Sequence, residues 1–135
     1  MYQYKAKLIR VVDGDTVDAL IDCGFSTFKK ERIRLYGIDA PESRTRDKAE
    51  KKRGLAATAR LKELIKEGKD EFIVKTIIDK KGKYGRLLGI LYREESFSSE
   101  FDPTDYPSYN QVLVEEGHAI EYIRGKKKLR QHIYK

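Results

Sequence analysis

The segment RLYGIDAPE, residues 34–42, is the stretch of sequence that decides the fold expected for this chain. It opens with alternating side chains, as in a β-strand, and runs into an acidic turn that Pro41 closes. It also contains one guanidinium and two carboxylates, the groups that a metal-assisted attack on a phosphodiester requires. The segment therefore predicts a strand that delivers a functional site at its end.

Two other segments share this combination of strand formers, turns and charged groups. Upstream, VVDGDTV at residues 11–17 is an acidic turn between two predicted strands, in which Gly14 permits a positive φ. Downstream, KYGR at residues 83–86 places a second arginine on a glycine turn. None of the three segments is decisive alone, but together and in this order they are.

The composition favours a single domain with a polyanionic partner. The chain has 135 residues, 39% of them hydrophobic, and a net charge of +7, which favours nucleic acid as the partner. Its one cysteine excludes an intramolecular disulfide, and no apolar run approaches the roughly 20 residues of a membrane span. Residues 1–5 lack the core of a signal peptide, so we expect a cytoplasmic protein unless a precursor segment is missing. We also expect a monomer.

Hydrophobic periodicity predicts five strands and one longer helix. The strands are expected at residues 2–12, 16–22, 25–36, 71–79 and 87–93, with a helix at 54–66 between the third and the fourth. Ser108 and Gln111 have the spacing of a capping box, which predicts a second, short helix that Gly117 ends. This order predicts a five-stranded oligonucleotide-binding (OB) β-barrel with flanking helices, an α+β fold.

The predicted barrel domain spans residues 1–123 and is followed by a basic tail at 124–135. Residues 43–52 are expected to form a charged loop. Residues 94–108 are too long for a simple connection, which predicts an insertion loop that is either mobile or locally functional.

Strand alternation assigns a direction to the arginine of the opening segment. Ile33 and Leu35 share one face of the third strand, so Arg34 points to the other face, toward the acidic turn. A guanidinium stays charged and can bond two phosphate oxygens at once, which makes Arg34 and Arg86 candidates to neutralise a phosphate. Taken singly, each is more often a surface or ion-paired residue.

The carboxylates of the two acidic turns suit a hard divalent cation such as calcium, which binds clustered oxygens. Asp15 and Asp39 lie in turns that end adjacent strands, so they can converge, and Ala40 can add its backbone carbonyl. Glu42 is placed to hold or deprotonate a metal-bound water. The alternative is that these aspartates only form turns.

The three segments together resemble the marks of the thermonuclease, or staphylococcal nuclease-like, family. The marks are DGDTV at residues 13–17, Arg34 followed by DAPE at 39–42, and KYGR at 83–86, and the resemblance extends from about residue 6 to 123. The fold of that family is a five-stranded OB barrel with flanking helices, and its activity is calcium-dependent hydrolysis of DNA and RNA.

The resemblance implies calcium as the cofactor and nucleic acid, both single-stranded DNA and RNA, as the substrate. It implies that Asp15, Asp39 and the Ala40 carbonyl bind calcium, and that Glu42 reaches a bound water as general base. It also implies that Arg34 and Arg86 hold the scissile phosphate and stabilise the transition state. Positions that match substrate contacts or the family's mobile loop are Lys48, Lys83, Tyr84 and Tyr122.

The segment 94–108 departs from the family because it adds five acids to a chain expected to bind a polyanion. These acids would repel nucleic acid, restrict the groove, dock a partner, or simply form a solvated loop. Two hypotheses other than an enzyme therefore stay open. One is a catalytically silent OB module that binds nucleic acid or protein, and the other is an interaction platform. The complete set of two aspartates, one glutamate and two arginines favours the enzyme.

Overall fold

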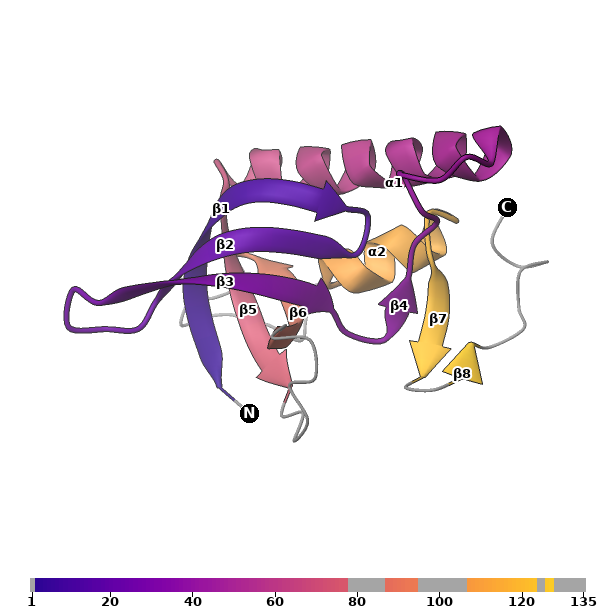
Figure 1. Cartoon of the computed structure of the whole chain (residues 1–135). Helices are drawn as coiled ribbons and strands as arrows, with labels where there is room; N and C mark the ends of the chain where they lie inside the picture. The colour runs from indigo at the N-terminus through magenta and orange to yellow at the C-terminus, as the bar shows by residue number, and fades with distance from the viewer. Residues whose placement is uncertain (1, 78–86, 95–106, 124–125, 128–135) are drawn as a thin grey trace.

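Five strands close into a barrel in the order β1-β2-β3-β6-β5 (Figure 1). The computed structural model describes residues 2–77, 87–94, 107–123 and 126–127. Neighbouring barrel strands run antiparallel, except that β3 and β6 are parallel. The predicted five-stranded OB barrel is confirmed. Its strands are β1 (Gln3–Asp13), β2 (Thr16–Asp22), β3 (Phe28–Leu35), β5 (Glu71–Ile77) and β6 (Leu87–Arg93).

The long strand β1 closes the barrel because it pairs with β2 and also with β5. Its register with β2 shifts between Leu8 and Arg10 and again between Val11 and Asp13. Such bulges bend a strand and increase its twist. They therefore let β1 curve from one edge of the sheet to the other, and the second shift lies directly before the acidic turn.

The predicted boundaries hold for β2 and β6, whereas β3 begins later than predicted, at Phe28. The residues before it form a loop in which Gly24, Phe25 and Ser26 have φ values of 82°, 55° and 59°. Positive φ is incompatible with a strand, which explains the difference. The predicted end of the fourth strand at residue 79 lies outside the described residues.

The helix α1 (Lys48–Glu67) lies along the barrel in contact with β1 and β5 (Figure 1). It begins at Lys48, so the expectation of a loop at residues 43–52 and a helix start at Gly54 was wrong. The side chain of Asp47 caps the helix by accepting hydrogen bonds from the backbone N–H groups of the next turn. The first turns of α1 are charged, so hydrophobic periodicity gave no sign of them.

The second helix, α2 (Tyr109–Glu115), matches its prediction. Ser108 is its N-cap, and the Ser108 side chain accepts a hydrogen bond from the backbone N–H of Gln111. Neither described helix combines the length and the apolar character that a membrane-spanning helix would need.

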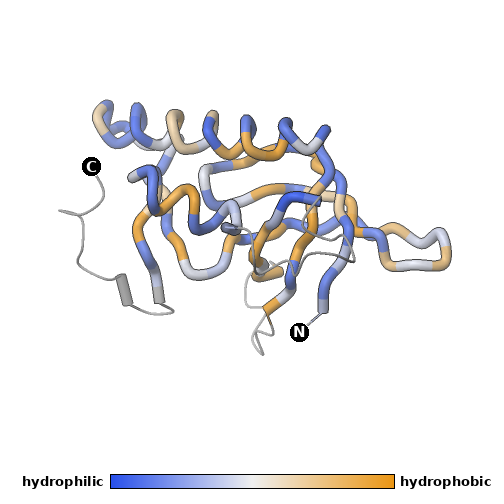
Figure 2. Tube along the Cα trace, turned by 180° about the vertical axis from the view of Figure 1, so that it is seen from behind, coloured by the Kyte–Doolittle hydropathy of each residue, from blue (hydrophilic) through white to orange (hydrophobic). Residues whose placement is uncertain are grey.

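The hydrophobic core fills the barrel and continues under the helices. In Figure 2 hydrophobic residues recur along the barrel strands and at intervals along α1, as expected for elements with one buried face. Fully buried side chains come from the strands and from both helices: Val17, Ile33, Leu35, Phe72, Leu91, Ala57, Leu61, Ile65 and Leu113.

A second, smaller sheet of β4 (Ile38–Asp39), β7 (Ile120–Ile123) and β8 (Lys126–Lys127) lies beside the barrel (Figure 1). This sheet was not predicted from the sequence, because strands of two to four residues are too short to show a period. Ile38 pairs with Glu121 and Asp39 with Ile120, and the backbone N–H of Tyr122 donates to the Gly37 carbonyl at 2.8 Å. The segment after β3 is thus held by a distant part of the chain.

Gly54 on α1 marks a close backbone contact, and replacing it by alanine should destabilise the protein. A Cβ at this position would overlap the Glu42 carbonyl oxygen and lie 2.7 Å from the backbone nitrogen of Ser43. Alanine is about 1 kcal/mol better than glycine inside a helix, but backbone atoms cannot rotate away from a new methyl group. We expect Gly54→Ala to lower the free energy of unfolding by about 1–3 kcal/mol in urea titrations.

The matched control is Ala59→Gly, at an exposed position of the same helix. It isolates helix propensity, and we expect it to cost about 1 kcal/mol. A Gly54→Ala protein at least as stable as the wild type would show that α1 does not approach the Glu42 turn this closely.

Candidate active site

The end of β3 brings Arg34 between two carboxylates. Thr16 of β2 is the cross-strand partner of Arg34, so the β1–β2 turn lies next to the arginine. Arg34 Nη1 lies 2.9 Å from Asp15 Oδ2, and Nη2 lies 3.5 Å from Asp39 Oδ1. The Arg34 side chain is only 16% exposed, while the flanking Ile33 and Leu35 are buried in the barrel. Alternation therefore directs Arg34 as predicted.

Asp15 ties the acidic turn to the strands around it. Its Oδ1 accepts the Thr16 hydroxyl at 2.9 Å, and its Oδ2 accepts the Ala40 backbone N–H at 2.8 Å. Its carbonyl accepts the Leu35 N–H at 2.7 Å. Asp15 is 8% exposed, so its carboxylate is held in place before any ligand binds.

The adjacent Gly14 serves close packing rather than positive φ. It is absent from the described residues with positive φ, contrary to expectation. A Cβ at Gly14 would lie 2.6 Å from the Cβ of Ala57 and 3.0 Å from that of Ala40. The glycine therefore lets the acidic turn fit between α1 and the residue that follows β4.

Glu42 lies on the next turn, and its backbone is held while its side chain is exposed. The Glu42 N–H donates to Glu50 Oε2 at 3.1 Å, and the Ser43 hydroxyl donates to Asp13 Oδ1. Among the described residues, the Glu42 carboxylate makes no hydrogen bond or ion pair. A carboxylate on an anchored turn that faces solvent is available to a ligand.

The remaining predicted site residues lie on other elements or outside the described residues. Lys48 is the exposed first residue of α1, so its expected position in a loop was wrong. Tyr122 lies half-buried in β7, beside the Gly37 turn. Lys83, Tyr84 and Arg86 lie outside the described residues. The structure thus gathers Arg34 with Asp15, Asp39 and Ala40.

The donor chemistry at this cluster fits a hard cation. Two carboxylates, of Asp15 and Asp39, face the Arg34 guanidinium, and the Ala40 backbone is held beside them by its N–H bond to Asp15. No group of three or more His, Cys, Asp or Glu suited to a metal occurs in the described part of the chain. Arg34 Nη1 is buried and lies outside hydrogen-bonding geometry despite its distance to Asp15. A cation here would take its other ligands from carbonyls and water, as calcium commonly does.

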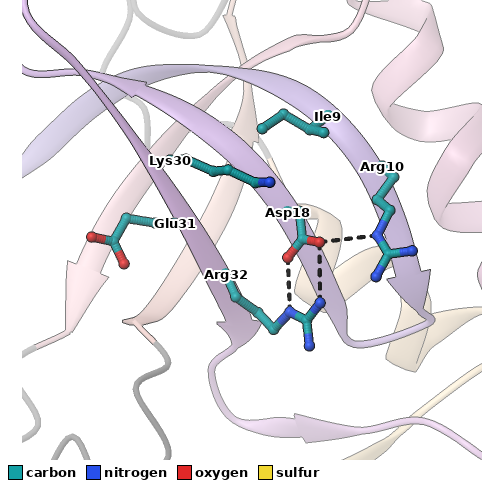
Figure 3. Close-up of a pocket in the computed structure, with 6 residues that line it drawn as sticks. All are labelled: Ile9, Arg10, Asp18, Lys30, Glu31 and Arg32. Atoms are coloured by element: carbon teal, nitrogen blue, oxygen red, sulfur yellow. Dashed lines mark hydrogen bonds and ion pairs between the residues drawn. The ribbon is translucent and has the colours of Figure 1, made fainter.

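A second charged cluster, of Asp18, Arg32 and Arg10 (Figure 3), was not predicted from the sequence. The register of β2 with β3 places it next to this site. Asp18 accepts hydrogen bonds from Arg32 and Arg10, and the bond from Arg32 is the main cause that lowers the pKa of Asp18 to about 2. The pairing Asp18↔Arg32 lies one repeat along the same face from Thr16↔Arg34. Alternation in both strands was the available signal.

Comparison with known proteins identifies the class that this barrel and site define. Residues 32–135 match the model of the family described as staphylococcal nuclease homologue. The chain belongs to the staphylococcal nuclease family.

The individual relatives share 28–30% sequence identity with this chain. The chain is 29% identical over 119 residues to a micrococcal nuclease of Shigella flexneri, covering 88% of this chain and 59% of the relative. It is 28% identical to protein ParB of Escherichia coli, covering 89% and 58% of the two chains. It is 30% identical to endonuclease YncB of Bacillus subtilis, covering 86% and 47%. The chain therefore spans only between 47% and 59% of the length of these relatives.

Proposed function

We propose that this protein is a calcium-dependent nuclease that hydrolyses phosphodiester bonds of single-stranded DNA and RNA. One observation carries the proposal: Arg34 lies between Asp15 and Asp39, and the turn that follows presents the exposed Glu42. Family membership supports it, as do relatives whose names are micrococcal nuclease and endonuclease.

Each residue of the cluster has a chemical role in this reaction. Asp15, Asp39 and the Ala40 carbonyl would hold calcium. When bound, calcium would neutralise charge on the phosphate and favour ionisation of the attacking water.

The protein's own side chains act on the phosphate and on the water. Arg34 donates its fork of N–H groups to the non-bridging phosphate oxygens, on which charge builds up in the transition state. Glu42 accepts the proton of the attacking water as general base. Arg86 is the proposed second phosphate ligand.

The substrate contacts extend the proposal beyond the reacting bond. Lys83 would pair with a phosphate, while Tyr84 and Tyr122 would stack on a base or sugar. Lys48 projects from the exposed start of α1, near the turn that carries Glu42. The contribution of Lys48 would therefore come from a helix end rather than from a loop.

Cleavage of a labelled oligonucleotide tests the function. With added calcium we expect degradation of both single-stranded DNA and RNA, and excess EDTA should abolish it because the carboxylates would lose their cation. Products are separated on a denaturing gel over a calcium titration. A wild-type protein that binds the oligonucleotide but leaves both substrates intact at every calcium concentration would contradict the enzyme and favour the binding module.

A further inference from the structure

The outward face of β3 carries a row of cations that begins at the candidate active site. Lys30, Arg32 and Arg34 are alternate residues, so they share one face of the strand, spaced about 6.5 Å apart. Their cross-strand partners on β2 are Leu20, Asp18 and Thr16. Ile33 and Leu35 point into the core, so the row lies on the outer surface of the barrel.

An open depression of about 420 Å³ lies along this row (Figure 3). Arg10 and Arg32 reach Asp18 from either side of it, whereas Glu31 points away. Glu31 also pairs with Lys29 at 2.9 Å. Three cations therefore face the depression against the single carboxylate of Asp18. The residues that line it are Ile9, Arg10, Asp18, Lys30, Glu31 and Arg32.

Asp18 holds two guanidinium groups in fixed positions. Arg32 donates from Nε to Oδ1 at 2.8 Å and from Nη2 to Oδ2 at 3.2 Å, and Arg10 donates from Nε to Oδ2 at 3.0 Å. The Asp18 side chain is 10% exposed, but those of Arg32 and Arg10 are 44% and 56% exposed. Each guanidinium has five N–H donors, so both keep donors that Asp18 does not use. The Asp18 carboxylate thus orients two exposed guanidinium groups.

An exposed aromatic ring extends the row on the side away from Arg34. Phe28 is the next alternate residue of β3 after Lys30, and it is 56% exposed. Proteins that bind single-stranded nucleic acids combine phosphate-binding cations with exposed aromatic rings, because the bases of a single strand are free to stack on the rings. A duplex keeps its bases stacked on one another and has no base to offer Phe28.

We infer that Lys30 and Arg32 of β3, together with Arg10 of β1, bind the phosphates of a single-stranded polynucleotide next to the scissile bond, with Phe28 stacking on a base. These three cations are here called the cationic row, which does not include Arg34. The inference rests on the proposed function, since Arg34 marks where the scissile phosphate would bind. The strand would then run from Arg34 along β3 toward the β2–β3 hairpin, which projects beyond the barrel (Figure 1). Asp18 is a positioning residue that touches no substrate.

Two variants test the cationic row without leaving a buried charge unpaired. R10Q/D18N/R32Q removes both arginines together with their carboxylate, and Lys30→Gln removes a cation from outside the hydrogen bonds that join Asp18 to the two arginines. Lys62→Gln, exposed on α1, changes the net charge by the same amount and is the matched control. Circular dichroism melts confirm that each variant is folded.

Binding is measured by fluorescence anisotropy in EDTA, with a labelled oligothymidylate of about a dozen nucleotides. We expect both row variants to bind about tenfold more weakly than Lys62→Gln, with the log–log salt slope reduced by about 0.7 for each phosphate that the protein no longer neutralises. Phe28→Ala should weaken binding without changing the salt slope, because stacking releases no counterions. Row variants with the affinity and salt slope of Lys62→Gln would overturn the inference.

Cleavage with calcium separates the failure of this inference from the failure of the proposed function. The row variants should lose about tenfold in kcat/KM on the long oligonucleotide and keep the wild-type value on a dinucleotide, which cannot reach the row. If the wild type cleaves both but the variants match Lys62→Gln, the row is wrong and the nuclease stands. If the wild type cleaves neither but the variants still lose affinity in EDTA, the row stands and the nuclease is wrong.

Discussion

Glu42→Gln should lower calcium-dependent cleavage by about 10²–10⁴-fold while leaving the stability of the protein unchanged. Glutamine has nearly the same shape but cannot take a proton from the attacking water. Glu42 is exposed, and its carboxylate makes no hydrogen bond or ion pair with another described residue, so its replacement leaves the fold intact. The measurement is kcat on a single-stranded oligonucleotide at saturating calcium, with a thermal melt of the same sample.

Glu63→Gln, which removes a charge from an exposed position on α1, is the control and should keep wild-type kcat. If Glu42→Gln lowers only the affinity for calcium, so that excess calcium restores kcat, then Glu42 is a ligand and not the base. A rate within about twofold of the wild type at all calcium concentrations would remove Glu42 from the chemistry altogether.

Arg34→Ala should have two effects of opposite sign, one on catalysis and one on metal binding. We expect kcat to fall by about 10³-fold, because a preorganised donor to the phosphate is lost. We expect calcium to bind more tightly, because the guanidinium no longer competes with it for Asp15 and Asp39. Isothermal titration with calcium and single-turnover kinetics measure the two quantities separately.

The free energy of unfolding of Arg34→Ala should depend on calcium. Without metal, Asp15 stays buried and loses its cation, which should cost about 3 kcal/mol in the free energy of unfolding. Calcium should restore most of that loss. Arg53→Ala, at an exposed position of α1, should change none of the three quantities. An Arg34→Ala protein that melts identically with calcium and with EDTA would contradict the placement of calcium between these carboxylates.

The barrel could be predicted from the sequence because its strands either alternate between apolar and polar side chains or are continuously apolar. Strands β2 and β6 were predicted with their observed boundaries, and the direction of Arg34 followed from the burial of its two neighbours. The N-terminal turns of α1 were missed because a helix that extends beyond the core has no apolar period to detect. The loop before β3 was missed because nothing in Phe25 or Ser26 indicates a positive φ.

The site was harder to predict than the fold because its geometry depends on contacts between distant segments. Their turns at the ends of adjacent strands suggested that Asp15 and Asp39 converge, but only the ion pairs in the structure show that both reach Arg34. The hydrogen bond from the Ala40 N–H to Asp15 joins positions 25 residues apart, and no local pattern encodes it. Strand alternation places Asp18 and Arg32 on one face each of β2 and β3, but only the register of the two strands makes them neighbours.

The pairing of β4 with β7 has a consequence for synthesis on the ribosome. Asp39 is made early, but its strand partner Ile120 is made late, and the Gly37 carbonyl can accept its hydrogen bond only after Tyr122 has been made. A nascent chain can therefore close part of the barrel before the turn that carries Asp39 gains its backbone pairing with β7. In the proposed nuclease, the turn that carries Asp39 would gain its β7 partner only when the last described strands leave the exit tunnel.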